Sequence, residues 1–168
     1  MPRISPTQAG GINRCAFLDM IGFSEIGAQL LAASDDGYNV LVGSIAAAPN
    51  LFHDYSQHPN ILVTVRQNPL LQSTAAGRYQ LLHRYWPPYQ EQLKLPDFGP
   101  VSQDLIAIEQ IRECQALPDI DAGKFAAAVA LCAHIWASLP GNDYEQHQNE
   151  LVDLQAAYQR AGGIVLDG

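Results

Sequence analysis

The sequence predicts an α+β fold in which helices predominate and a small antiparallel sheet follows the first long helix. Apolar residues recur at helical spacing in several long segments, and two shorter segments are rich in β-branched residues. The 168 residues, 48% of them hydrophobic, suffice for one compact core. We therefore expect a flexible N-terminal segment over residues 1–12 and a single domain over residues 13–168.

Helical spacing accounts for most of the predicted elements. The first helix is expected over about Ile12 to Ser24, with Phe17, Leu18 and Ile21 on its buried side. The other helical segments are a short turn over 28–33, a helix over 79–93 that Pro87 and Pro88 interrupt, a helix from near Pro100, and helices over about 122–137 and 143–160. "AGG" after the last segment is typical of a helix end.

Two short segments read as strands. They are "YNVLVG" at residues 38–43 and "NILVTV" at residues 60–65, and both are bounded by Gly, Pro, Asn or Asp. The segment between them, "SIAAAPNLFHDYSQHP", is too long for a tight hairpin turn. The predicted sheet is therefore small and carries a long connecting loop.

Composition excludes several classes of partner. The net charge is −8 and the nine basic residues are scattered singly, which argues against binding to nucleic acid. No apolar run approaches the roughly 20 residues that cross a bilayer, so we expect no membrane insertion. The first fourteen residues lack the apolar core of a secretory signal, and we expect the protein to be made and first kept in the cytoplasm.

The sequence contains no clear nucleophile or metal-binding motif. Cys15, Cys114 and Cys132 have spacings typical of neither zinc nor redox motifs, so buried free thiols are expected. His53, Asp54 and His58 could hold a cation, but a polar turn is the preferred interpretation. The chain lacks the Gly-x-Ser-x-Gly elbow of serine hydrolases. We expect neither a metal nor a cofactor.

Carboxylate chemistry remains, and Glu25 is its first candidate. The stretch "AFLDMIGFSE" ends on this carboxylate after a run of apolar residues. Alone, such a glutamate is more often a solvated helix end. In a low-dielectric cleft, burial would raise its pKa and make it a general acid. Asp35, Asp36 and Asp54 are possible second carboxylates, as a two-acid glycosidase would need.

A second segment, "STAAGRYQLL", has features of a ligand-binding loop. Its small residues and glycine allow a ligand to approach the backbone closely. Tyr79 could then stack on a ligand, and Gln80 could form hydrogen bonds to it. A plain connection with a core tyrosine fits these residues equally well.

Seven segments in this order resemble the bacteriophage lambda endolysin family. They are "AFLDMIGFSE", "GYNVLVG", "FHDYSQHP", "STAAGRYQLL", "SQDLIAIEQI", "ALPDID" and "IWASLPG", and the resemblance extends from about Ala16 to Gly163. It implies a lysozyme-like fold with a mostly helical lobe and a small β-lobe flanking a glycan cleft. It also implies a lytic transglycosylase that cleaves peptidoglycan between N-acetylmuramic acid and N-acetylglucosamine and leaves a 1,6-anhydro product.

The resemblance places the catalytic residue at Glu25, where one carboxyl serves as acid and then as base. By analogy with transglycosylases, Ser73, Thr74 and Gln80 are expected near the sugar, with Tyr79 as a further substrate contact. Tyr144, just beyond "IWASLPG", is a candidate for a ring that contacts the glycan. The implied partner is the peptidoglycan strand, reached at the cell wall after a holin opens the host inner membrane. The size of the chain fits a monomer.

Two alternatives remain open at this point. Hydrolytic phage muramidases pair the glutamate with an Asp and a Thr, but the corresponding positions here fall on Ser34 and Val40. Asp35 lies only one position away, so a hydrolase that uses a second carboxylate is disfavoured without being excluded. An inactive peptidoglycan-binding protein is the other alternative, although the retained Glu25 argues against it.

Overall fold

The computed structural model describes residues 2–141 and 148–166, and its contacts divide the chain into two compact units. The first unit comprises Met1–Glu25 and Asp104–Gly168, and the second comprises Ile26–Gln103. Helices and one two-stranded antiparallel sheet make up the regular structure of the described residues, so the α+β prediction is confirmed. The prediction of one domain over residues 13–168 stays a prediction.

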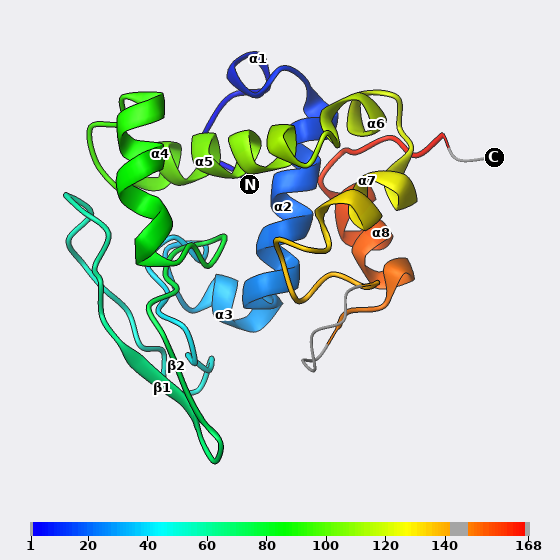
Figure 1. Cartoon of the computed structure of the whole chain (residues 1–168). Coiled ribbons are helices and arrows are strands. Elements are labelled where there is room, and N and C mark those ends of the chain that lie inside the picture. Colours follow the sequence, from blue (N-terminus) through cyan, green and yellow to red (C-terminus); the bar gives the residue numbers. More distant parts are fainter. Residues whose placement is uncertain (1, 142–147, 167–168) are drawn as a thin grey trace. The chain divides into compact units, whose positions relative to one another are not determined.

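The first unit is helical (Figure 1). Its helices are α1 (Pro6–Ala9), α2 (Ile12–Ile26), α5 (Pro100–Glu113), α6 (Leu117–Asp121), α7 (Phe125–Cys132) and α8 (Leu151–Arg160), with the last residue of α2 and the first turn of α5 assigned to the second unit. The predicted first helix is therefore confirmed as α2. The segment predicted over 122–137 contains only the shorter α7, and α6 precedes it as a separate helix. The last predicted helix is observed as α8, and residues 143–147 of that prediction lie outside the described residues.

Three aromatic rings form the centre of the first unit. Phe17 on α2 meets Phe125 on α7 edge-on with ring centroids 6.3 Å apart, and it meets Tyr158 on α8 at 6.4 Å. Phe125 and Tyr158 complete the triangle at 5.0 Å. Edge-to-face packing of buried rings adds to the free energy gained by burying their area. This triangle ties α2 to the C-terminal helices, and therefore fixes the helix that carries Glu25.

Residues 2–11, expected to be a flexible lead-in, contain a short helix and a buried side chain. Ser5 caps α1 through a capping box with Gln8. Ile4 is only 3% exposed, and its backbone amide and that of Arg3 both donate hydrogen bonds to Asp104, at 3.0 and 2.6 Å. A buried carboxylate with two backbone donors is the kind of charge that a protein interior tolerates.

The second unit contains the sheet. Its elements are α3 (Ala28–Ala32), β1 (Val63–Gln67), β2 (Leu70–Ser73), the 3₁₀ helix η1 (His83–Tyr85) and α4 (Trp86–Leu93). The two strands form an antiparallel ribbon (Figure 1). Thr64 faces Gln72 in this ribbon, and a cis Asn68–Pro69 bond lies in its turn. The predicted strand at 60–65 is therefore found, in part, as β1.

The predicted strand at residues 38–43 is wrong. This segment has only isolated bridges, Val40 to Leu51 and Leu41 to Ala76. Val40 and Leu41 are both buried although they are consecutive, so the segment does not show the alternation of a half-buried strand. The sheet partner is instead β2, whose residues Leu70 and Leu71 are exposed. Its sequence, "LLQS", lacks the β-branched residues by which strands are recognised.

The prolines predicted to interrupt a helix over 79–93 instead begin one. Pro87 and Pro88 stand at the first positions of α4, where a missing backbone N–H costs no intrahelical hydrogen bond. Residues 79 and 80 lie in a turn, Leu81 forms an isolated bridge to Ala76, and η1 leads into the helix. Trp86 is buried in this unit, and its indole nitrogen donates to Gln57 at 2.9 Å.

The side chain of Gln103 connects three backbone segments of the second unit. Its amide nitrogen donates to the carbonyls of Tyr38 and Phe98, and its oxygen accepts the backbone N–H of Arg78 at 2.9 Å. Gly77 has φ +82°, and a Cβ atom there would lie 2.8 Å from the Gln103 Cδ atom. A glycine is thus required on both conformational and steric grounds. The loop "STAAGRYQLL" is held in place by this arrangement.

All three cysteines are free and buried, as predicted. Burial raises the pKa of the Cys15 thiol. In the described residues, no helix is both long and apolar enough to cross a membrane.

Candidate active site

Glu25 lies in the last turn of α2, at the end of the apolar run that the sequence singled out. Its carboxyl group is partly buried. The hydroxyl of Ser138, in the turn that follows α7, donates a hydrogen bond of 2.5 Å to Glu25 Oε1. The C-terminal end of a helix carries partial negative charge and disfavours a carboxylate. This glutamate is therefore placed where its neutral form is favoured.

Burial raises the pKa of Glu25 above its ordinary value. Hydrogen bonds from the side chain and the backbone of Ser138 act in the opposite direction, because they stabilise the charged form. Among the described residues, the causes that shift the pKa of Glu25 are its burial and the hydrogen bonds from Ser138, and none of these causes is a charged side chain. A carboxyl group with a raised pKa keeps its proton to a higher pH than an ordinary glutamate does, and Ser138 stabilises the anion that forms when the proton is given up.

Ser138 is itself held by two other residues. Its hydroxyl lies 2.7 Å from the hydroxyl of Ser24 on α2. The side-chain amide of Asn149, just before α8, donates to Ser24 Oγ at 3.0 Å. Sequence reasoning missed all three of these residues. The only indication available was that Ser24 and Ser138 fall within two of the motifs that resemble the endolysin family.

The three aspartates considered as second carboxylates all have partners within the second unit. Asp35 accepts the Tyr55 hydroxyl at 2.8 Å, and Asp36 forms an ion pair with the buried Arg78 at 2.8 Å. Asp54 is exposed and accepts the backbone N–H of Ser56 at 2.8 Å. Each of these contacts is typical of structural loop residues.

Four of the five predicted substrate residues lie in the second unit, and the structure gives each a local role. Ser73 ends β2, and its hydroxyl accepts the backbone N–H of Ala75 at 3.1 Å. Thr74 accepts the backbone N–H of His83 at 3.2 Å. Both side chains are partly buried. Their contacts to a sugar stay predictions.

Tyr79 and Gln80 differ in accessibility. Tyr79 is 5% exposed and packs edge-on against Tyr38, with ring centroids 6.5 Å apart, so its ring belongs to the core of the second unit. The sequence allowed this interpretation as well as glycan stacking. Gln80, with φ +50°, is partly buried, and its amide nitrogen donates to the carbonyl of Gly77 at 2.9 Å. The fifth residue, Tyr144, lies outside the described residues.

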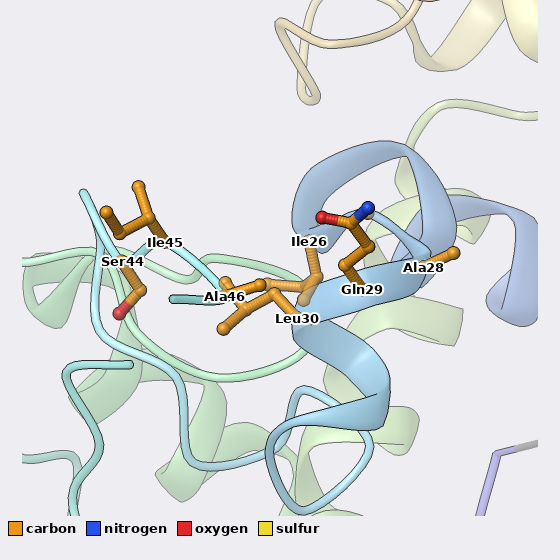
Figure 2. A pocket seen from close by; sticks show the side chains of 8 residues that line it. Ile26, Ala28, Gln29, Leu30, Ser44, Ile45 and Ala46 are labelled. Atoms are coloured by element: carbon orange, nitrogen blue, oxygen red, sulfur yellow. The ribbon is translucent and has the colours of Figure 1, made fainter. Parts of the chain in front are cut away.

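An open apolar hollow of about 380 Å³ lies between the start of α3 and the loop at residues 44–46. Figure 2 shows the side chains of Ile26, Leu30 and Ala46 gathered at its centre, with Gln29 and Ile45 at its edges. The lining begins at Ile26, the residue that follows Glu25 in the chain. A mostly apolar surface with few polar atoms suits the C–H face of a sugar ring or an acetyl methyl group better than a charged ligand.

The histidine cluster weighed as a cation site has other partners. His58 is buried, and both of its ring nitrogens are engaged by backbone, Nε2 with the carbonyl of Leu81 at 2.9 Å and Nδ1 with the N–H of Asn60 at 3.1 Å. Within residues 2–141 and 148–166, no group of three or more His, Cys, Asp or Glu side chains is arranged to hold a metal ion.

A family model described as Endolysin matches residues 15–165 of this chain. The chain is 49% identical to the endolysin of Escherichia phage lambda over 155 residues, which cover 90% of this chain and 92% of that protein. It is 44% identical to the endolysin of Escherichia phage P2 over 167 residues, 98% of this chain and 99% of that protein. The chain belongs to the endolysin family.

Two solved structures of bacteriophage lambda lysozyme have the same fold as this chain. Bacteriophage lambda lysozyme in complex with a chitohexasaccharide matches this endolysin with a TM-score of 0.83 at 45% identity, covering 98% of this chain and 99% of that chain. A second structure of lysozyme from bacteriophage lambda matches with a TM-score of 0.79 at 44% identity and the same coverage. The predicted lysozyme-like fold and the family resemblance are both confirmed.

Proposed function

We propose that this endolysin is a peptidoglycan lytic transglycosylase in which Glu25 is the single catalytic acid and base. The observation that carries the proposal is the environment of Glu25, where burial raises the pKa of a carboxyl group that one serine supports. The match to a lysozyme that binds a chitohexasaccharide supports a glycan as the ligand.

The proposed reaction uses one carboxyl group twice. The Glu25 proton passes to the glycosidic oxygen as the bond from that oxygen to C1 of N-acetylmuramic acid breaks, which frees the 4-hydroxyl of N-acetylglucosamine. The C6 hydroxyl of the same muramyl residue then attacks C1, and its proton passes to the Glu25 carboxylate. A 1,6-anhydro ring forms without the addition of water, and the enzyme recovers its acid.

The alternatives are a hydrolase that uses a second carboxylate and an inactive glycan-binding protein. The product separates the three. Digestion of purified peptidoglycan followed by mass spectrometry should yield anhydro-muropeptides. Products heavier by one water would instead indicate hydrolysis. The absence of any soluble product would indicate a binding protein.

The Asp35→Asn and Asp54→Asn variants test the two-carboxylate alternative further. Both aspartates have structural partners, so each variant should retain its lytic rate within about tenfold, well short of the 10²–10⁴ that a general acid or base contributes. The rate of clearing of a cell-wall suspension measures this. A near-total loss in either variant, with the thermal unfolding unchanged, would restore the two-carboxylate mechanism.

We further propose that the protein acts as a monomer on glycan strands at the cell wall, after a holin has permeabilised the host inner membrane. The supporting observation is membership of the endolysin family. Expression of the chain alone in a bacterial host should leave cells intact until the membrane is opened with chloroform. Lysis before that treatment would show another route to the wall.

A further inference from the structure

Glu25 is supported by a hydrogen-bonded chain of three side chains, two of which come from a distant part of the sequence. Ser24 precedes Glu25 on α2, Ser138 lies in the turn after α7, and Asn149 lies just before α8. The Ser138 hydroxyl contacts Glu25 at 2.5 Å and the Ser24 hydroxyl at 2.7 Å. All four residues belong to the first unit.

The orientation of the Asn149 amide is determined by its neighbours. Its nitrogen lies 3.2 Å from the carbonyl oxygen of Ser24 and 3.3 Å from that of Ser138. A backbone carbonyl can only accept a hydrogen bond, so the atom that faces both carbonyls is the NH₂ group. The backbone N–H of Asn149 also donates to the Ser138 carbonyl, at 2.9 Å, which fixes the position of the residue.

This orientation gives the chain a direction. The Asn149 NH₂ group donates to Ser24 Oγ at 3.0 Å and cannot accept from it. The Ser138 hydroxyl has one proton and gives it to Glu25, so the donor in the contact between the two hydroxyls is Ser24. The Ser138 proton is then directed to Glu25 Oε1, as the structure has it.

We propose that Ser138 is a positioning residue for the reacting carboxyl group, and that Ser24 and Asn149 orient its hydroxyl so that Oε1 always accepts and the transferable proton stands on Oε2. The proposal rests on the proposed function of Glu25. A proton on Oε1 would point at the Ser138 proton, so the neutral acid carries it on the other oxygen. After transfer, the same hydrogen bond stabilises the anion that must later receive the C6 hydroxyl proton.

Removal of the Ser138 hydroxyl should make Glu25 harder to ionise. In Ser138→Ala, we expect the pKa of Glu25 to rise by about one unit, because burial then acts with less opposition. The protonated carboxyl is the active acid, so the alkaline limb of the kcat/KM profile should move upward by the same amount. Ser138→Thr keeps the hydroxyl and should restore both values.

Ser102→Ala is the matched control. Ser102 is buried, and its hydroxyl also donates to a carboxylate, Asp97, at 3.1 Å, but it is not part of this chain of hydrogen bonds. This variant should move neither the Glu25 pKa nor the pH profile. Ser24→Ala leaves the contact to Glu25 in place and should shift both in the same direction by less, which keeps the test available if Ser138→Ala does not fold.

Carbon-13 NMR titration of the Glu25 carboxyl, assigned by its loss in Glu25→Gln, reads the pKa without reference to catalysis. An unchanged pKa in both Ser138→Ala and Ser24→Ala, or an equal shift in Ser138→Ala and Ser138→Thr, overturns the positioning proposal and leaves the proposed function standing. A raised pKa with an unmoved alkaline limb supports the positioning contact and overturns the assignment of Glu25 as the acid.

Discussion

Replacement of Glu25 by Gln should reduce the lytic rate by about a thousandfold or more, because a general acid or base contributes 10²–10⁴ and this carboxyl is proposed to perform both roles. The Gln side chain keeps an oxygen that can accept from Ser138, so the local structure should persist. Clearing of a peptidoglycan suspension measures the loss. Glu113→Gln is the control, since Glu113 also ends a helix but is exposed and should retain full activity.

The same variant should be at least as stable as the wild type at neutral pH. The folded pKa of Glu25 is raised, so the stability that the neutral carboxyl provides is complete below its ordinary pKa of about 4.5 and is lost as pH rises through the folded value. Gln cannot ionise and escapes this loss. The melting temperature of Glu25→Gln should therefore match the wild type near pH 4 and equal or exceed it at pH 7. A large drop at pH 7 would show that the ionised form supports the fold.

Arg78 should give the largest effect on stability. Its side chain is almost fully buried, forms an ion pair with Asp36 at 2.8 Å, and lies over the Tyr38 ring at 5.3 Å. Removal of one partner from a buried pair leaves an uncompensated charge and costs about 3–5 kcal/mol. Asp36 is partly exposed, with a side-chain exposure of 32%, so we expect the lower end of that range for Arg78→Met in denaturant unfolding.

Two further variants identify the cause of that loss. In Arg78→Met with Asp36→Asn, no uncompensated charge remains, so the double variant should be more stable than the sum of the two single changes predicts. Asn also tolerates the φ of +48° at position 36. Arg84 provides the control, because its guanidinium also lies over a tyrosine ring, at 4.7 Å, but is exposed. Arg84→Met should lower the free energy of unfolding by less than about 1 kcal/mol. If the stability losses of Arg78→Met and Asp36→Asn are additive in the double variant, the ion pair is not the cause of the loss.

Helices were predicted from sequence where their apolar spacing is strong. Helix α2 was located because its buried residues recur at the helical period, and the buried Phe17 triangle confirms the face that was assigned. The prediction of a strand at 38–43 was wrong because β-branched residues also fill buried irregular segments. Only tertiary contacts distinguish such a segment from a strand. Helix α6 was missed because a five-residue helix has too few positions to show a period.

Only the part of the site that lies in one sequence motif, Glu25, could be predicted from the sequence. Glu25 was identified because it ends an apolar helix and a segment that resembles a known family. Ser138 was not, since 113 residues separate it from Glu25 and nothing local to either residue indicates the contact. A serine beside a leucine and a proline has no sequence feature that distinguishes a turn residue from a carboxylate partner. Partners brought together only by packing require a structure.

The free, buried state of Cys15, Cys114 and Cys132 has a consequence for the timing of activity. A fold without disulfide cross-links needs no oxidant to complete its covalent structure. Sheltered thiols also react slowly when the surroundings become oxidising. The protein can therefore fold under reducing conditions, and its fold does not depend on an oxidation step before it meets its substrate.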